Sequence, residues 1–239
     1  MAEPVPFVPS DERALLVVLP HPDDETFSTG GTLAACHDAG VPTVYLCTTY
    51  GDMGRRMGRP AFAHRESLRD VRQRELAEAC AVLGTEVRFL GLRDKCVEFE
   101  DPADIAGRIR AVIDEVRPST VVTFYPGHAV HPDHDATGWF TQLAVRGLPA
   151  GERPRLLAVA VGDLKTNIAA LGEADVVSDI AATSDRKVEA LKAHRSQTEA
   201  MFLRWDADQE QAFQERLLKG ERFYLLDPDL VTAYERSRT

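Results

Sequence analysis

Two short segments hold the residues best suited to chemistry, and the first is His21-Pro22-Asp23-Asp24-Glu25. His21 and Asp24 lie three positions apart and can both reach one ion, supplying the nitrogen and oxygen ligands that zinc accepts. Asp23 between them would stay free, and an uncoordinated carboxylate beside an activated water is the arrangement of a general base. In a simpler interpretation, the two aspartates only cap a following helix.

The second segment is His131-Pro132-Asp133-His134, and it follows His128 in a chain that has only seven histidines. One histidine from this cluster would complete a site of three protein ligands with an open position for water, which is the pattern of catalytic zinc. The carboxylate of Asp133 could hold and charge a second histidine, which would then stabilise an oxyanion or protonate a leaving group. Spacing alone leaves open whether His131 or His134 is the ligand.

Both segments follow apolar runs that are typical of buried strands in a parallel sheet. The predicted strands cover residues 14–19, 43–48, 87–92, 120–124 and 156–161, with a weaker candidate at 175–180. Helical patterns alternate with them at residues 26–39, 67–83, 103–116 and 136–145. This order predicts an α/β, Rossmann-like fold with a mainly parallel sheet and helices on both faces. Ligands bind at the carboxyl edge of such sheets, which is where both histidine segments fall.

The chain has no internal repeat and no long flexible linker, and its 239 residues can bury the core of one domain. We therefore expect a single domain over residues 1–239, with an N-terminal extension at 1–12 and a C-terminal helical and capping region at 184–239. Two charged helices are predicted within that last region, at residues 185–198 and 207–219.

The charge balance favours a small-molecule partner. The formal net charge is -10, and binding of nucleic acid or of an anionic membrane surface would need clustered Lys and Arg, so neither partner is expected. Residues 1–11 have neither the basic region nor the apolar region typical of a leader peptide, and no apolar run is long enough to span a bilayer, so we expect a cytoplasmic protein. The cysteines form no CxxC pair and are predicted to be reduced structural thiols: Cys36, Cys47, Cys80 and Cys96.

At these residues the sequence resembles a known family. The segments HPDDE and HPDH are similar to those of the LmbE-like or PIG-L family of zinc-dependent deacetylases, which remove acetyl groups from N-acetylglucosamine units. The similarity extends to residues 51–55, Arg72 with Glu75, and residues 90–95 and 192–197. Residues 123–130 look most like the second type of bacillithiol biosynthesis deacetylase, whose substrate is N-acetylglucosaminyl malate. The resemblance implies a hydrolase of small N-acetylated amino sugar conjugates, in a family that often assembles as trimers or hexamers.

The resemblance also divides the roles of the two segments. Three side chains would be the ligands of one Zn²⁺ ion per chain: His21, Asp24 and His134. The same donors also accept Fe²⁺ or Mn²⁺. Asp23 would be the general base, while His131 would support the oxyanion and the leaving amine and would be oriented by Asp133. Glu25 receives no role.

A set of substrate-binding residues follows from the same resemblance: Asp52, Arg55, Arg72 and Asp94. An arginine in the cleft suits a malate carboxylate, because its fork can grip both oxygens. Several relatives carry a tyrosine just before HPDH, whereas this chain has His128 there and Tyr125 further back, and either could assist the oxyanion. Simpler interpretations make Arg72 a solvated helix residue, Asp94 a turn residue and Arg55 part of a surface loop.

Two other functions remain open at the level of the sequence. The same metal centre could cleave the amide of a thiol conjugate or of another acylated amino sugar. A sugar-binding protein that has lost turnover is less favoured, because every residue that the chemistry requires is present.

Overall fold

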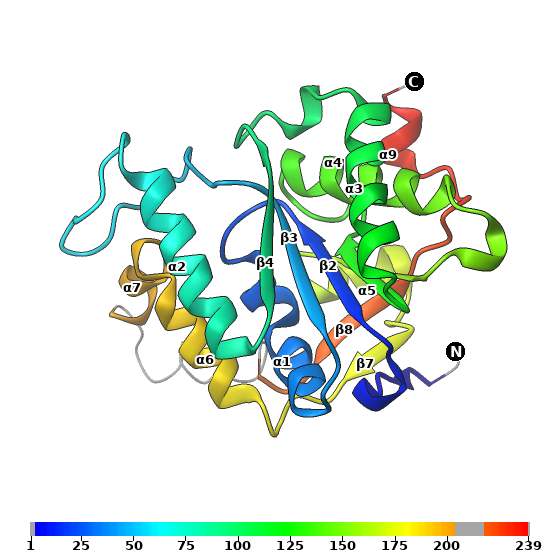
Figure 1. The fold of residues 1–239 in the computed structure, drawn as a ribbon, viewed down its shortest axis with the longest axis horizontal. Helices are drawn as coiled ribbons and strands as arrows, with labels where there is room; N and C mark the ends of the chain where they lie inside the picture. The colour runs from blue at the N-terminus through cyan, green and yellow to red at the C-terminus, as the bar shows by residue number, and fades with distance from the viewer. Residues whose placement is uncertain (1–2, 204–217, 239) are drawn as a thin grey trace.

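The apolar runs form strands of one eight-stranded sheet in the computed structural model, which describes residues 3–203 and 218–238 (Figure 1). Six strands match predicted runs: β2 (Leu15–Leu19), β3 (Thr43–Thr49), β4 (Glu86–Leu92), β5 (Thr120–Phe124), β6 (Arg155–Val159) and β7 (Val176–Ser178). Two further strands are not predicted by the sequence: β1 (Val5–Pro6) and β8 (Glu221–Leu225). The expected N-terminal extension and the expected capping region therefore each add a strand to the sheet.

The strands lie in the order β1-β7-β8-β6-β5-β2-β3-β4. β8 runs antiparallel to β6 and β7, and the other paired strands are parallel. From β2 the chain moves outward to β3 and β4, and it then returns to β5 on the other side of β2. The carboxyl ends of β2 and β5 therefore flank a topological switch point, where open α/β sheets bind their ligands.

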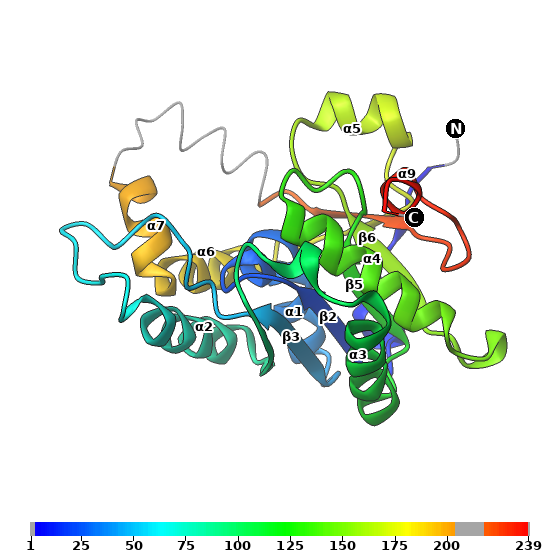
Figure 2. The same ribbon diagram turned by 90° about the horizontal axis from the view of Figure 1, so that it is seen from above.

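Helices cover both faces of the sheet (Figures 1 and 2). The four predicted helices are present: α1 (Asp24–Asp38), α2 (Leu68–Leu83), α3 (Pro102–Val116) and α4 (Pro132–Arg146). α4 begins at Pro132 rather than at the predicted Ala136, because Pro suits the first helical position and the His131 ring caps the helix. The earlier start places Asp133 and His134 in the first turn of α4.

The C-terminal part differs from the sequence prediction. The single helix predicted at residues 185–198 is two helices, α6 (Ser184–Ala193) and α7 (Arg195–Phe202), which are separated by His194. The helices α5 (Leu164–Leu171) and α9 (Ala233–Arg236) are additional, as are the 3-10 turns η1 (Pro9–Asp11), η2 (Val97–Phe99) and η3 (Ala150–Glu152). The helix predicted at residues 207–219 lies mostly outside the described residues.

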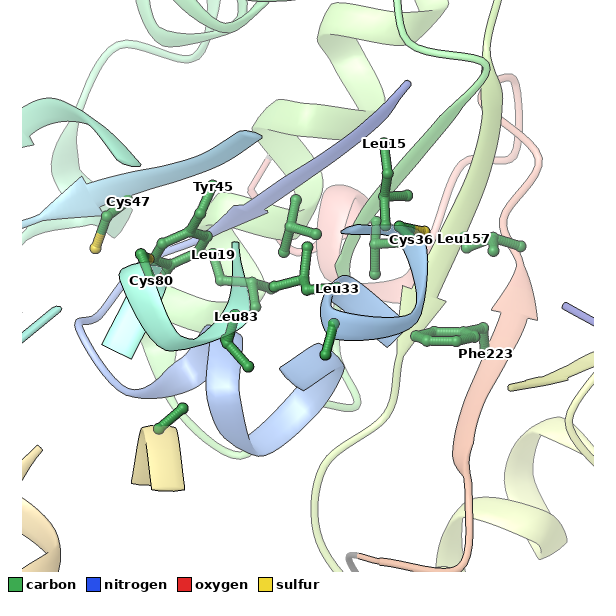
Figure 3. Packing of buried hydrophobic residues seen from close by; sticks show 14 of the residues in the cluster. Leu15, Leu19, Leu33, Cys36, Tyr45, Cys47, Cys80, Leu83, Leu157 and Phe223 are labelled. Carbon is green, nitrogen blue, oxygen red and sulfur yellow. The ribbon is translucent and has the colours of Figure 1, made fainter. Parts of the chain in front are cut away.

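Side chains of the central strand β2 alternate between two apolar clusters, one on each face of the sheet. Leu15 and Leu19 point into the cluster beneath α1 and α2, which Figure 3 shows from close by. Leu16 and Val18 point into the cluster beneath α3 and α4. Every residue of β2 is buried, so the sheet fixes the position of His21, which follows two residues after the strand.

The cysteines are unpaired, as predicted, and three of the four are buried. Burial raises the pKa of the Cys36 thiol to about 12, so this thiol stays protonated at neutral pH. Among the helices of the described residues, none combines the length and the apolar character needed to cross a membrane.

Candidate metal centre and active site

The two histidine segments meet at the carboxyl ends of β2 and β5. His21 lies in the turn between β2 and α1, and His134 lies in the first turn of α4. The turn after β2 is tied to β3, because the Tyr45 hydroxyl donates to the carbonyl of His21 at 2.6 Å. The backbone N–H of Thr49 likewise donates to the carbonyl of Pro20 at 3.0 Å. The site is therefore built on strand ends and helix starts.

Three side chains bring donor atoms to one point. His21 Nδ1 lies 3.2 Å from His134 Nε2 and 3.3 Å from Asp24 Oδ2. The third edge, from His134 Nε2 to Asp24 Oδ2, measures 3.5 Å. Tetrahedral ligands at the usual zinc bond lengths of about 2.0–2.1 Å lie about 3.3–3.4 Å apart. The donor spacing therefore fits a metal ion with three protein ligands.

A second group of residues, His21 with His131 and Asp133, is also close enough to hold a metal ion. Its donor atoms, however, are already used within the protein. The Asp133 carboxylate accepts the backbone N–H groups of Lys95 at 2.7 Å and Val97 at 3.2 Å. His131 Nδ1 accepts the backbone N–H of Asp133 at 3.1 Å. These contacts favour the first group, formed by His21, Asp24 and His134.

Hydrogen bonds on the far side of each ring determine which nitrogen can bind a metal. His134 Nδ1 faces the carbonyl of Ala129 at 3.1 Å, so it donates there and leaves the lone pair on Nε2. His21 Nε2 lies 3.1 Å from a carboxylate oxygen of Asp133 and 3.2 Å from one of Asp94, so it donates and leaves the lone pair on Nδ1. Such contacts orient metal-binding histidines and raise their basicity.

Two of the three candidate ligand residues hold the protonation states that a metal ion requires. Burial lowers the pKa of His134 to about 4, so its ring, which stacks on Phe124 at 4.1 Å, is neutral. Burial alone would raise the pKa of Asp24, but His134 and the hydrogen bonds from His21 outweigh burial and lower this pKa to about 2. At neutral pH the site thus offers an ionised carboxylate and a neutral imidazole.

Negative charge gathers around His21. Burial would lower the pKa of this histidine, but the surrounding carboxylates outweigh burial and raise it well above its ordinary value. Those carboxylates come from three residues: Asp24, Asp94 and Asp133. A buried group of carboxylates with this much negative charge favours a bound cation.

Asp23 lies beside the ligands in an unusual backbone conformation. Its φ of 119° is left-handed, which costs a residue other than glycine about 1–3 kcal/mol unless its surroundings hold it there. The carboxylate Oδ2 lies 3.1 Å from Arg72 Nη2. Burial raises the pKa of Asp23 to about 6, although Arg72 opposes this rise. A carboxylate with this pKa is suited to accept a proton and to return it near neutral pH.

Arg72 is buried against the loop that follows β3. Arg72 is 4% exposed. Its guanidinium donates to the carbonyl of Gly51 at 3.0 Å and to the carbonyl of Pro22. Gly51 has a φ of +64°, and a Cβ there would lie 2.2 Å from Arg72 Nη1, so only glycine leaves room for the arginine. The interpretation of Arg72 as a solvated helix residue is therefore wrong, while a direct contact with substrate stays a prediction.

The contacts of Asp133 differ from those expected. Its carboxylate is fully buried and faces His21, and only its backbone N–H contacts His131. The reason is the early start of α4, since the capping position of His131 turns the next side chains of the helix toward β2. Asp133 therefore contacts His21, a candidate metal ligand, through its carboxylate and contacts His131 through its backbone.

The predicted substrate residues after β3 and β4 differ in burial. Asp94 is 3% exposed and accepts the backbone N–H of Met53 at 2.7 Å, so it anchors the loop after β3. On that loop, Asp52 is partly buried and Arg55 is exposed. The backbone carbonyl of Asp52 accepts a hydrogen bond from Arg65 at 2.7 Å. This loop therefore has an anchored backbone and an exposed arginine side chain.

The two candidates for assisting the oxyanion lie ring to ring on the loop before α4. The ring of Tyr125 lies 5.3 Å from that of His128 and 6.0 Å from that of Tyr224, both in edge contacts. The backbone carbonyl of His128 accepts the N–H of Val161 from the segment after β6. Tyr125 is thus packed between two rings, and the choice between it and His128 stays a prediction.

Sequence reasoning missed a buried pair behind Asp23. Glu25 Oε2 accepts the backbone N–H of Asp23 at 3.0 Å, and His194 Nε2 lies 2.7 Å from Glu25 Oε1. Both side chains are fully buried. The sequence offers two signals, the place of Glu25 in the HPDDE segment and the family resemblance of residues 192–197. Neither signal pairs Glu25 with a residue 169 positions away.

The fold and the site define an α/β protein with a group of side chains that could hold a metal ion. The profile of a family described as PIG-L: GlcNAc-PI de-N-acetylase matches residues 16–145. A Bacillus cereus relative, described as a probable N-acetyl-alpha-D-glucosaminyl L-malate deacetylase 2, is 51% identical over 192 residues, which cover 80% of this chain and 86% of the relative. The chain belongs to the PIG-L family and is a hydrolytic N-deacetylase, as the HPDDE and HPDH segments predict.

Solved structures share the fold at low sequence identity. An N,N'-diacetylchitobiose deacetylase from Pyrococcus horikoshii matches with a TM-score of 0.71 and 21% identity, over 95% of this chain and 89% of that one. A 4-carboxy-2-hydroxymuconate hydratase from Pseudomonas putida matches with a TM-score of 0.68 and 19% identity, over 92% and 98%. Because a hydratase has the same fold, the fold alone does not determine the reaction.

Proposed function

We propose that this enzyme removes the acetyl group from N-acetylglucosaminyl malate, and that one Zn²⁺ ion held by His21, Asp24 and His134 serves the reaction. The observation that carries the proposal is the triangle of donor atoms, with edges of 3.2, 3.3 and 3.5 Å, beside the carboxylate of Asp23. The name of the Bacillus cereus relative supports the substrate. Iron or manganese would suit the same donors, so the identity of the metal is part of the proposal.

Asp23 is the proposed general base. When bound, the metal ion would polarise the acetyl carbonyl and lower the pKa of a nearby water to about 7. Asp23 accepts a proton as this water attacks the carbonyl carbon, and Arg72 holds the carboxylate in place. The same carboxylate then returns the proton to the amide nitrogen as the C–N bond breaks. The products are the free amine and acetic acid, which ionises to acetate.

His131 is proposed to stabilise the carbonyl oxygen as that oxygen gains negative charge. Its Nδ1 accepts the backbone N–H of Asp133, so the ring proton lies on Nε2 and can be donated to the substrate. The ring centroid lies 5.0 Å from that of His21, which places the donor beside the ligand group. Burial lowers the pKa of His131, so it acts as a neutral donor at neutral pH.

Recognition of the malate group is assigned to the loop after β3. We propose that Arg55 binds a malate carboxylate, since its side chain is exposed on a loop whose backbone is anchored by Asp94. Asp52 would contact the sugar from the same loop. His128 and Tyr125 are retained as candidates for assisting the oxyanion. A single-domain trimer or hexamer in the cytoplasm stays the prediction for the assembled protein.

The test is release of acetate by the zinc-loaded enzyme from three substrates. We expect kcat/KM for N-acetylglucosaminyl malate to exceed that for N-acetylglucosamine by about fivefold, because an exposed carboxylate paired with arginine adds up to about 1 kcal/mol. A preference for an acylated thiol conjugate would instead support that alternative substrate. Bound sugar with no turnover in the presence of zinc, iron or manganese would contradict the proposed function.

A further inference from the structure

The backbone of Asp23 is held by two buried residues that no step of the proposed reaction uses. Glu25 Oε2 accepts the backbone N–H of Asp23 at 3.0 Å. The other oxygen of Glu25 accepts the hydroxyl of Thr26 and lies 2.7 Å from His194 Nε2. A chain of hydrogen bonds therefore runs from the proposed base to the break between α6 and α7.

These hydrogen bonds hold the backbone at a residue with an unfavourable conformation. Asp23 is one of four residues other than glycine with positive φ among those that the structure describes, and its φ of 119° is the largest of the four. In this conformation its N–H points back into α1, where the Glu25 carboxylate is its acceptor. On the other side, Arg72 holds the carboxylate of Asp23 at 3.1 Å. One anchor thus fixes the backbone of the base and another fixes its side chain.

The position of His194 is itself fixed by the helices on either side. Its backbone N–H donates to the carbonyl of Leu191, and its carbonyl accepts the N–H of Gln197 at 2.9 Å. The next residues are held by α2 as well, because Glu75 accepts both the N–H and the hydroxyl of Ser196, at 2.7 and 2.6 Å. His194 therefore gives Glu25 a rigid partner.

We propose that Glu25 and His194 are positioning residues that hold Asp23 in its left-handed conformation, so that its carboxylate faces the acetyl carbonyl. The inference rests on the proposed role of Asp23 as the base. Displacing a reacting group by about 1 Å can cost about 100-fold in rate. Loss of the Glu25 contact should therefore lower kcat while KM and metal affinity change little.

The first test compares two substitutions at one position. Glu25→Leu removes the acceptor of the Asp23 N–H, and we expect kcat to fall about 10- to 100-fold with KM within about twofold. Glu25→Gln keeps an oxygen for that N–H, and it should recover most of the lost kcat. Equal losses in both variants would overturn the proposal. Should Glu25→Leu fail to fold, His194→Phe, which keeps the ring but removes the donor, should lower kcat about tenfold with the same KM.

A matched control separates positioning from general stability. Lys187 and Glu221 form another buried pair on α6 and β8, with Nζ and Oε1 2.6 Å apart, and Glu221 also accepts the N–H of Gly31 in α1. Lys187→Met should lower the melting temperature at least as much as Glu25→Leu does, but it should leave kcat unchanged. A fall in kcat that follows the melting temperature in both variants would overturn the proposal.

Two further measurements distinguish this inference from the proposed function. In the Asp23→Ala background, Glu25→Leu should cause no further loss of residual kcat, because the two residues act as one unit. Amide hydrogen exchange of Asp23, followed by NMR, should become at least about tenfold faster in Glu25→Leu and should not change in Lys187→Met. The exchange result stands even if the wild-type enzyme acts on another substrate. Unchanged exchange would overturn the positioning role.

Discussion

The candidate metal-ligand group and the loop after β3 both lie at the carboxyl edge of the sheet but are held in different ways. His21 and His134 each make a hydrogen bond on the far side of the ring, and Asp24 accepts the backbone N–H of His21 at 2.9 Å. On the loop, the backbone is anchored by Asp94, whereas the side chain of Arg55 is exposed. The reacting groups are thus fixed by the fold, while the groups proposed to select the substrate lie on an exposed loop.

The largest expected effect on kcat concerns Asp23, the proposed base beside the metal-ligand group. Asp23→Ala should lower kcat by about 10³-fold, within the range of about 10² to 10⁴ that general-base catalysis supplies. The metal content should not change, because Asp23 is not one of the proposed ligands. Steady-state kinetics and elemental analysis of the same sample measure both quantities. Turnover within about tenfold of the wild type would remove the base assignment.

The next largest effect is on metal affinity, and it tests the contact between Asp133 and His21. Asp133→Asn removes the negative charge that faces His21, and metal affinity should fall about 10- to 100-fold, measured by competition with a chelator. Asp104→Asn removes the same charge from the first turn of α3, away from the site, and should change affinity less than about threefold. Equal affinities in the two variants would contradict the supporting role of Asp133.

Substitutions at two glycines test the contact between the loop after β3 and Arg72. Gly51→Ala places a Cβ 2.2 Å from Arg72 Nη1, so the arginine must move away from Asp23, and kcat should fall about tenfold or more. Gly40 also has a positive φ, +74°, but a Cβ there meets nothing within 4 Å. Gly40→Ala should therefore cost about 1 kcal/mol of stability and leave kcat unchanged. Similar kinetics in both variants would show that the Arg72 contact is unimportant.

The smallest effect is expected on the exposed side. Arg55→Ala should raise KM for N-acetylglucosaminyl malate about fivefold, since an exposed ion pair contributes up to about 1 kcal/mol, with kcat unchanged. It should not change KM for N-acetylglucosamine, which lacks the carboxylates. Arg59→Ala, on the same loop, is the control with no expected effect on either substrate. Equal shifts for the two substrates would exclude malate recognition by Arg55.

The sequence predicts the parts of the fold that depend on neighbouring residues, and it does not predict those that depend on long-range packing. The apolar runs identify six strands, because buried strands of a parallel sheet are continuous in sequence, and the segments around His21 and His134 lie at their carboxyl ends. The strand order, which sets β2 beside β5, depends on long-range packing. β8 was missed because its pattern of burial mixes buried and exposed positions in a short segment, and it joins the sheet in the antiparallel direction.

Residue roles could be predicted only where local spacing or the family resemblance indicates them. The three donors could be proposed from two short motifs, but the contact between Asp133 and His21 spans 112 positions and depends on where α4 begins. The pairing of Glu25 with His194 requires the break between α6 and α7, which the continuous helical pattern at residues 185–198 conceals. Contacts between side chains that are distant in sequence therefore cannot be predicted without a structure.

The most direct test of the account is the metal content of two histidine variants of the zinc-loaded enzyme. The proposed function assigns His134 to the metal ion and His131 to the substrate, in keeping with their contacts. His134→Ala should lose the bound zinc, whereas His131→Ala should keep about one zinc ion per chain and lose turnover by about 10² to 10³-fold. Retention of zinc by His134→Ala together with its loss from His131→Ala would contradict the assignment.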